Sequence, residues 1–322
     1  MIRCHWEGSD EMKTFAAIDV GSYELAMKIF EVSRTRGMKE IDHIRHSIDM
    51  GTESYTTGKL SYQRAEELCR VLREFSGIMK AYQVSDYVAY GTSAVRETEN
   101  TIILLDQIQQ RTGIHIEVLS NSEQRFLDYK SIAFQGEGFL KIIENGTAIV
   151  DIGGGSIQIS LFDKDTLVST QNMKLGVLRL RDNLAHLNAS IRQYENFLDE
   201  IINAQMAVYK KLYLKDREIK NIIIVDDYIS TLLRKKSINN EMTGYAGAEL
   251  FEKFRDVYHK ESLSELAKRW DMPEETMPLM YIALIMTKRI MEIMGAELIW
   301  APGVTLCDGI AYEYAQKNKI MV

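Results

Sequence analysis

The sequence of 322 residues predicts an α/β protein of two domains, each organised around its own mixed sheet. The first observation is a repeated unit, in which an apolar strand ends in aspartate and passes through a glycine turn into a second apolar strand. This unit occurs as AIDVGS at 17–22 and as VDIGGGS at 150–156, about one domain apart. The second observation is that amphipathic helical segments follow each unit. We therefore expect duplicated sheets that flank a cleft, with one glycine turn of each sheet pointing into it.

The first half of the chain alternates between strands and helices. Apolar runs predict strands at 14–20, 25–32, 40–50, 86–90 and 115–119. Apolar residues at helical spacing predict an amphipathic helix at 62–82, and a second helix at 100–112 ends at Gly113 as its C-terminal cap. His115 falls in an apolar strand, so we predict that its side chain is buried in the core.

The second half repeats this alternation. Strands are predicted at 147–152, 156–162, 166–173, 219–225 and 298–301. A helix is predicted at 191–212, a mostly helical region follows as far as Gly295, and a last helix covers 308–316. Methionines are frequent from Met277 to Met294, and we predict that they fill the core, because unbranched methionine side chains suit irregular gaps.

The composition restricts the class of partner. The formal net charge is −7, and sequence-independent binding to DNA needs a basic surface, so DNA is not an expected partner. The chain has no run of ~18 apolar residues that would span a membrane. The first residues lack the apolar core of a signal peptide. We expect a cytoplasmic protein with no membrane partner, in which residues 1–11 form a short leading tail.

The two glycine turns predict an anion site. Glycine leaves backbone N–H groups uncovered, and several such groups together form a concavity that binds phosphate. Ser22 and Ser156 add hydroxyl donors at the turns. Asp19 and Asp151 each stand at a strand end just before the turn, where a carboxylate can hold Mg²⁺ directly or through water.

Several segments together resemble the exopolyphosphatase/guanosine pentaphosphate phosphatase (Ppx/GppA) family. They are AIDVGS (17–22), YGTSAVRETEN (90–100), VLSNSEQRF (118–126), VDIGGGSIQIS (150–160), KLGVLRL (174–180) and GVTLCDG (303–309). The resemblance implies the actin-like, ribonuclease H-like fold of acetate kinase, sugar kinases and actin, in the short two-domain form. It implies an N-terminal domain at 1–130, on which helix 308–322 packs back, and a C-terminal domain at 131–307. It also implies pairing into a homodimer.

The same resemblance implies an activity and a set of site residues. The activity is Mg²⁺-dependent removal of the terminal phosphate of inorganic polyphosphate or of the 5′-phosphate of guanosine pentaphosphate. Arg96 would bind phosphate, because its planar guanidinium meets two oxygens at once. Asp19 and Asp151 would hold the metal. The expected phosphate-binding residues are Gly21, Ser22, Thr92, Ser93, Arg96, Gly153, Gly154, Gly155 and Ser156.

The position of the catalytic base departs from the family's pattern. Hydrolysis needs a carboxylate that orients and deprotonates the attacking water, and the family's glutamate falls on Gln124. Glu123 is one residue earlier. Glutamine can position a water, but it cannot take its proton at neutral pH. We expect Glu123 or Gln124 to position the nucleophilic water.

Other positions also differ from the sequence pattern of the family. A second family glutamate is Gln158, the Asn-Ser of the first turn is Tyr23-Glu24, and the arginine of the last motif is Cys307. Gln158 in place of a carboxylate would weaken Mg²⁺ binding. Segment 221–231, where the family has a glycine-rich stretch, contains no glycine.

Three functional classes follow. The first is a phosphohydrolase of the exopolyphosphatase type. The second is a catalytically weakened family member that binds polyphosphate or an alarmone nucleotide as a sensor or regulator. The third, an actin-like kinase, needs a glycine-rich adenosine loop, and the glycine-free segment 221–231 argues against it.

Overall fold

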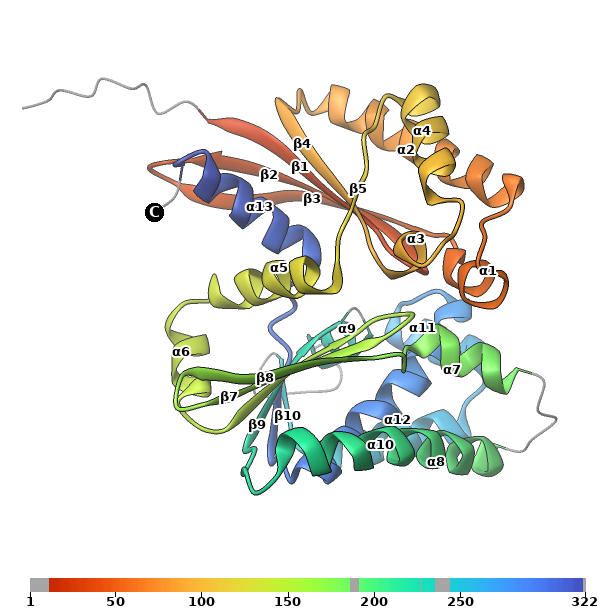
Figure 1. Cartoon of the computed structure of the whole chain (residues 1–322), viewed down its shortest axis with the longest axis vertical. Coiled ribbons are helices and arrows are strands. Elements are labelled where there is room, and N and C mark those ends of the chain that lie inside the picture. Colours follow the sequence, from red (N-terminus) through yellow and green to blue (C-terminus); the bar gives the residue numbers. More distant parts are fainter. Residues whose placement is uncertain (1–11, 186–190, 227, 235–243, 321–322) are drawn as a thin grey trace, which may run out of the picture. The chain divides into compact units, whose positions relative to one another are not determined.

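The computed structural model describes residues 12–185, 191–226, 228–234 and 244–320. Residues 1–11, the expected leading tail, lie outside these ranges. The chain divides into two compact units, traced in Figure 1, of which the first comprises Met1–Ser131 with Leu306–Val322 and the second comprises Ile132–Thr305. These divisions lie close to the predicted ones, after residues 130 and 307.

The first unit contains a mixed sheet of five strands in the order β3-β2-β1-β4-β5. The strands β1, β2 and β3 form an antiparallel meander, and β4 and β5 continue the sheet in parallel with β1. Their bounds are β1 (Lys13–Val20), β2 (Glu24–Ser33), β3 (Gly37–Ser47), β4 (Asp86–Gly91) and β5 (Glu117–Val118).

Helices cover both faces of this sheet (Figure 1). They are α1 (Met50–Thr57), α2 (Tyr62–Ala81), α3 (Ser93–Arg96), α4 (Thr101–Thr112), α5 (Asn121–Ala133) and α13 (Leu306–Lys317). Side chains of a strand alternate between faces. Accordingly, Ala16 and Ile18 of β1 pack in the cluster that includes α2 and α4, whereas Phe15 and Ala17 pack with α13. The ring of Phe15 stacks on Tyr314 of α13, with centroids 3.9 Å apart.

The segment after α4 both confirms and corrects the sequence-based expectations. Helix α4 ends at Gly113, which has φ +76° in the left-handed region, as predicted for a C-terminal cap. The prediction that His115 is buried is wrong, because this side chain is exposed. Strand β5 covers only Glu117–Val118, so His115 belongs to the preceding loop, where its Nδ1 lies 3.2 Å from Gln109 Oε1.

The second unit repeats the sheet of the first. Its strand order is β10-β11-β9-β6-β7-β8, with β6, β7 and β8 as an antiparallel meander and β9 and β11 continuing in parallel. Read from β8 to β11, this order matches β3 to β5, which confirms the predicted duplication of mixed sheets. The bounds are β6 (Thr147–Ile152), β7 (Ile157–Asp163), β8 (Thr166–Met173), β9 (Asn221–Val225), β10 (Tyr245–Ala246) and β11 (Leu298–Trp300).

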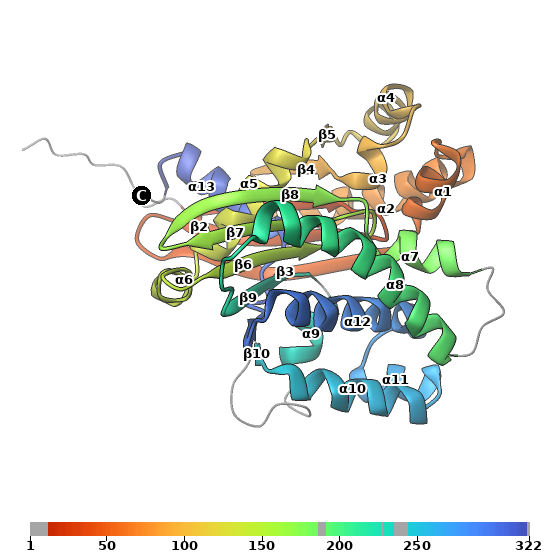
Figure 2. The same ribbon diagram turned by 60° about the horizontal axis from the view of Figure 1, so that its bottom comes forward.

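The helices of the second unit gather around α12, which contacts α7, α8, α9 and α10. Figure 2 shows α12 running beside α8 with α10 on its other side. The bounds are α6 (Glu137–Ile143), α7 (Val177–Leu184), α8 (Ile191–Tyr209), the π-helical turn η1 (Lys210–Leu214), α9 (Tyr228–Arg234), α10 (Ala248–Lys260), α11 (Leu263–Trp270), the 3₁₀ turn η2 (Glu274–Thr276) and α12 (Met277–Met294).

Helix α12 is the buried centre of this layer. Its methionines from Met277 to Met294 are all buried, which confirms their predicted role as core residues. In the part of the chain that the structure describes, no helix combines the length and the apolar character needed to cross a membrane.

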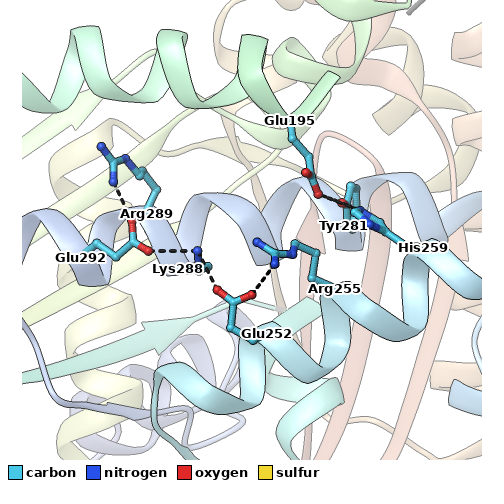
Figure 3. Close-up of polar contacts among 8 residues, drawn as sticks. All are labelled: Glu195, Glu252, Arg255, His259, Tyr281, Lys288, Arg289 and Glu292. Atoms are coloured by element: carbon cyan, nitrogen blue, oxygen red, sulfur yellow. Dashed lines mark hydrogen bonds and ion pairs between the residues drawn. The ribbon is translucent and has the colours of Figure 1, made fainter. Parts of the chain in front are cut away.

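A hydrogen-bonded group joins three helices of the second unit (Figure 3). His259 Nε2 of α10 lies 2.9 Å from Glu195 Oε1 of α8 and 2.7 Å from the hydroxyl of Tyr281 on α12, which itself donates to Glu195. Burial, and then the hydrogen bond to Glu195, raise the pKa of Tyr281. The phenol therefore stays protonated and remains a donor. Two turns further along α12, Lys288 bridges Glu252 at 2.9 Å and Glu292 at 3.0 Å.

A buried ion pair ties α13 to the first sheet. Lys28 of β2 is 4% exposed, and its Nζ lies 2.9 Å from Asp308 Oδ2 and 2.8 Å from Glu40 Oε2. Burial alone would lower the pKa of Lys28, but the two carboxylates outweigh it and the pKa is raised. Lys28 is therefore charged at neutral pH. Because a buried charge is costly when unpaired, the pair holds α13 and β3 to β2.

We predict that Lys28→Met lowers the free energy of unfolding by about 3 kcal/mol, since it removes the cation that pairs with the half-buried carboxylate of Asp308. Asp308 and Glu40 keep some solvent access, which places the loss at the lower end for a broken buried pair. Urea denaturation measures the change. Lys59→Met is the matched control, because Lys59 and Glu99 are both exposed and 4.0 Å apart, so its effect should be near zero. Equal stability of the two variants would contradict the prediction.

Candidate functional site

The first glycine turn is closed by a backbone hydrogen bond between β1 and β2. Gly21 N–H donates to the carbonyl of Glu24 at 3.0 Å. A Cβ on Gly21 would lie 2.6 Å from that same carbonyl oxygen, so a residue with a side chain would open the turn. Asp19 pairs with Ala26 two residues before the turn, which places it at the end of β1.

The second turn has the same construction. Gly153 N–H donates to the carbonyl of Ser156 at 3.0 Å, and a Cβ on Gly153 would lie 3.1 Å from that oxygen. Asp151 pairs with Gln158 two residues before the turn, as Asp19 does with Ala26. The repeated unit of the sequence is therefore also a repeat of hydrogen-bond geometry.

Helix α7 holds the carbonyl oxygens of the second turn. The contacts are Val177 N–H to Gly153 C=O at 3.1 Å, Leu178 N–H to Gly154 C=O at 2.9 Å and Arg179 Nε–H to Gly155 C=O at 2.7 Å. Within the described residues, the N–H groups of Gly154 and Gly155 donate to no backbone carbonyl. With the carbonyls engaged by α7, the turn keeps amide donors for an anion.

Arg96 and Gln124 meet in the first unit. Arg96 is the last residue of α3, and its guanidinium donates to the carbonyl of Leu119 at 2.7 Å. The same nitrogen makes a long contact of 3.5 Å with Gln124 Oε1 on α5. The carbonyl fixes the guanidinium beside the amide of Gln124, so these two predicted site residues are brought together.

Glu123 has a different partner. Ser120 N–H donates to Glu123 Oε2 at 2.8 Å, and Glu123 N–H donates to Ser120 Oγ at 3.2 Å. This reciprocal pair is a capping box at the start of α5. Hydrogen bonds from the side chain and then from the backbone of Ser120 lower the pKa of Glu123. The spacing Ser-x-x-Glu signals such a cap in the sequence, and the sequence analysis missed it.

Three predicted hydroxyl residues of the first unit are buried. Thr92 donates to the carbonyl of Val20 from its N–H at 3.2 Å and from its hydroxyl at 3.4 Å. Ser22 and Ser93 are joined through Tyr55 of α1, whose hydroxyl lies 2.6 Å from Ser22 Oγ and 2.8 Å from Ser93 Oγ. Tyr55 is a site residue that the sequence analysis did not find, because no motif connects α1 to the turn.

Asp151 and Gln158 form the candidate metal position of the second unit. Gln158 Nε2 donates to Asp151 Oδ2 at 3.2 Å. Gln158 is 3% exposed, and its Oε1 accepts no hydrogen bond within the described residues. Among all the residues that the structure describes, no group of three or more His, Cys, Asp or Glu side chains could hold a metal ion. One carboxylate beside an amide oxygen fits a hydrated Mg²⁺ that phosphates complete, rather than an all-protein cage.

Two further predicted positions have structural partners. The carbonyl of Tyr23 accepts a hydrogen bond from Ile48 N–H at 2.7 Å, in the segment that leads into α1. Cys307 is fully buried in the cluster that packs α13 against the sheet. A charged side chain at this position would have to enter an apolar core.

We predict that Gly176→Ala lowers the free energy of unfolding by about 1–3 kcal/mol, because the new Cβ would lie 2.2 Å from the carbonyl oxygen of Gly154. The start of α7 and the turn must then separate. Gly77→Ala in α2 is the control: its Cβ meets nothing within 4 Å, so a gain of about 0.5–1 kcal/mol is expected. Urea denaturation of both variants measures the difference, and a loss in neither would contradict the clash.

We predict that Glu123→Ala lowers the melting temperature, whereas Glu123→Gln largely preserves it at pH 7, because an amide oxygen can also accept the Ser120 N–H. The folded pKa of Glu123 lies below its unfolded value of about 4.3. The stabilisation of the folded state by the Glu123 carboxylate is therefore complete above the unfolded pKa, and it is lost as the pH falls through the folded pKa. Thermal melts from pH 7 to pH 3 should show this loss in the wild type and not in Glu123→Gln. Identical pH profiles would contradict it.

Known proteins similar to this chain include two kinds of curated relative. The exopolyphosphatase 1 of Mycobacterium tuberculosis is 24% identical over 164 residues, which cover 51% of this chain and 46% of the relative. The guanosine-5′-triphosphate,3′-diphosphate pyrophosphatase of Aliivibrio fischeri is 24% identical over 164 residues, covering 50% of this chain and 31% of the relative. The chain spans less than half the length of these relatives.

The fold has a counterpart among solved structures. The crystal structure of an exopolyphosphatase from Cytophaga hutchinsonii superposes with a TM-score of 0.81 at 18% identity, covering 96% of this chain and 100% of that one. This likeness confirms the predicted actin-like fold. The sequence model of the Ppx/GppA phosphatase family matches residues 29–318. Since that match covers most of the sequence, the chain belongs to the Ppx/GppA phosphatase family.

Proposed function

We propose that this protein is a phosphohydrolase of the exopolyphosphatase type, which removes the terminal phosphate of polyphosphate or the 5′-phosphate of guanosine pentaphosphate. The observation that carries the proposal is the second turn, whose carbonyl oxygens are engaged by α7 while the amides of Gly154 and Gly155 donate to no backbone carbonyl of the described residues. Such an array suits the oxygens of a phosphate chain. The two kinds of curated relative support these two substrate classes.

The proposed roles follow from chemistry. Arg96 contributes a charge-assisted hydrogen bond to a phosphate oxygen, and the carbonyl of Leu119 keeps its guanidinium in place. Ser22, Ser93 and Ser156 offer hydroxyls. Asp19 and Asp151 would hold Mg²⁺, which when bound supplies neutralisation of phosphate charge.

The proposed site lacks a good general base for the attacking water. Gln124 is the residue that contacts Arg96, and it cannot accept a proton from water at neutral pH. Glu123 is engaged in the capping box, which lowers its pKa and makes it a poor base. These two observations favour the second candidate function, a weakened enzyme that holds polyphosphate or an alarmone nucleotide as a sensor or regulator.

The residues that follow β9 argue against the third candidate function, an ATP-dependent kinase. Asp226 is 8% exposed, and its carboxylate accepts the N–H groups of Ile229 and Ser230, both at 2.9 Å. A carboxylate thus occupies the start of α9, where an incoming phosphate would be repelled. Segment 221–231 is also without glycine.

We predict that Gln124→Glu increases phosphate release by about 100-fold or more, the usual contribution of a general base. Release is measured from polyphosphate and from guanosine pentaphosphate, each with and without Mg²⁺. Glu123→Gln tests the other candidate base: a loss of phosphate release in this variant would show that Glu123, and not Gln124, positions the water.

Each outcome separates the two candidates. Robust turnover by the wild type that Gln124→Glu does not increase would overturn the weakened-base account. Tight binding of either substrate with no turnover, even in Gln124→Glu, would favour the sensor. Failure to bind both would overturn the proposal.

The location and assembly of the protein remain predictions. A cytoplasmic protein that pairs as a homodimer and does not bind DNA is expected from composition and from the family. Light scattering of the purified chain would measure the oligomeric state.

A further inference from the structure

Three consecutive peptide groups of the second turn face the same way. The carbonyls of residues 153–155 all accept hydrogen bonds from α7, so all three point toward that helix. In a planar trans peptide the N–H of the next residue points opposite to the C=O, and the described residues contain no cis bond. The N–H groups of Gly154, Gly155 and Ser156 therefore point away from α7, as a run of amides that suits an anion.

Ser156 supplies the third amide of this run. The residue is 8% exposed, and its N–H donates to no backbone carbonyl of the described residues. A buried N–H without an acceptor costs about as much free energy as a lost hydrogen bond. An oxygen from a bound phosphate would supply the acceptor.

The peptide that carries this third amide is held differently from the other two. The first two carbonyls accept backbone N–H groups, those of Val177 and Leu178. The carbonyl of Gly155 instead accepts the side-chain Nε–H of Arg179 at 2.7 Å. Glycine restricts its own backbone less than any other residue, so the bond from Arg179 adds a restraint that Gly155 does not supply. The direction of the Ser156 N–H thus depends on one side chain.

The first turn holds the corresponding carbonyl without a side chain. Tyr23 corresponds to Gly155, since each is the second residue after the glycine whose N–H closes the turn. The carbonyl of Tyr23 accepts a backbone N–H, that of Ile48, at 2.7 Å. In the second unit Arg179 therefore takes the place of a backbone donor.

We infer that Arg179 is a positioning residue for phosphate binding, whose Nε holds the peptide between Gly155 and Ser156 so that Ser156 N–H serves as a third amide donor to phosphate. The inference rests on the proposed function, because it assumes that the second turn receives phosphate. It concerns the donor at Nε, and not the charge of the guanidinium or its other contacts.

Two variants separate this donor from the charge. Arg179→Gln removes the charge but places an amide nitrogen on Cδ, which is where arginine carries Nε. Arg179→Lys keeps the charge but places a methylene group at that point. We expect glutamine to keep the peptide in position and lysine to release it.

The test is NMR of the full chain, made by cell-free synthesis with ¹³C in the glycine carbonyls and ¹⁵N in serine, and titrated to saturation with tripolyphosphate and Mg²⁺. Only serines that follow glycine are then selected, and the sequence has three: Ser9, Ser22 and Ser156. Ser156→Ala identifies the signal of Ser156. The Ser156 amide proton should shift downfield in the wild type and in Arg179→Gln, and this shift should be lost in Arg179→Lys.

Titration calorimetry of the same proteins measures the affinity. Arg179→Lys should bind tripolyphosphate about tenfold more weakly than the wild type, the value of one charge-assisted hydrogen bond. Arg179→Gln should bind more tightly than Arg179→Lys, although it lacks the charge. Arg181→Lys is the matched control: it makes the same change two residues further along α7, where the guanidinium donates to Asp182 at 2.9 Å, and it should behave like the wild type.

The outcomes distinguish this inference from the proposed function. Binding by the wild type without a shift of the Ser156 amide overturns the inference alone. A shift that persists in Arg179→Lys, or that is lost in an Arg179→Gln variant whose thermal melt shows it to be folded, also overturns it. If Arg179→Gln does not fold, the wild type and Arg179→Lys still decide. No binding by the wild type overturns the proposed function and the inference with it.

Discussion

Both units depend on the same backbone hydrogen bond, which runs from the first glycine after an aspartate-bearing strand to the carbonyl three residues later. It measures 3.0 Å in each unit, from Gly21 to Glu24 and from Gly153 to Ser156. A side chain on either glycine would crowd the very oxygen that accepts this bond. The bond closes a hairpin loop of the same length in each unit and thereby places an aspartate at the same point of each sheet.

The two turns are supported in different ways. Helix α7 holds the carbonyl oxygens of the second turn through backbone N–H groups and through the side chain of Arg179, which leaves the amides of the turn for a ligand. Helix α1 holds the first turn through the N–H of Gly51, which donates to Ser22, and through the hydroxyl of Tyr55, which contacts Ser22 and Ser93. The two copies of the hairpin are therefore held by different chemical groups.

Both glutamines that replace expected glutamates lie beside a charged group. Gln124 faces Arg96, and Gln158 donates to Asp151. In each case a neutral amide satisfies the charged neighbour without adding a negative charge. Less negative charge near a phosphate chain reduces repulsion, and the missing carboxylate reduces proton transfer. This local chemistry supports the second of the two proposed functions, in which a weakened enzyme holds a phosphate chain.

The fold was largely readable from the sequence. Strand positions, the Gly113 cap and the buried methionines of α12 follow from local periodicity and from the conformational freedom of glycine, which are properties of short segments. The one clear failure, His115, arose because an apolar run does not reveal how few of its residues pair in a sheet.

The features of the candidate site likewise fall into those that the sequence predicts and those that only the tertiary structure shows. The sequence by itself determined the repeated Asp-Gly turns and predicted a phosphate site at them, because a glycine turn and the aspartate before it are local features. Only the tertiary structure decided that Gln124 meets Arg96 and that Tyr55 joins Ser22 to Ser93. Both contacts depend on which helices pack beside which strand ends, and the hydrogen-bond partner of a side chain is set by that packing rather than by its neighbours along the chain.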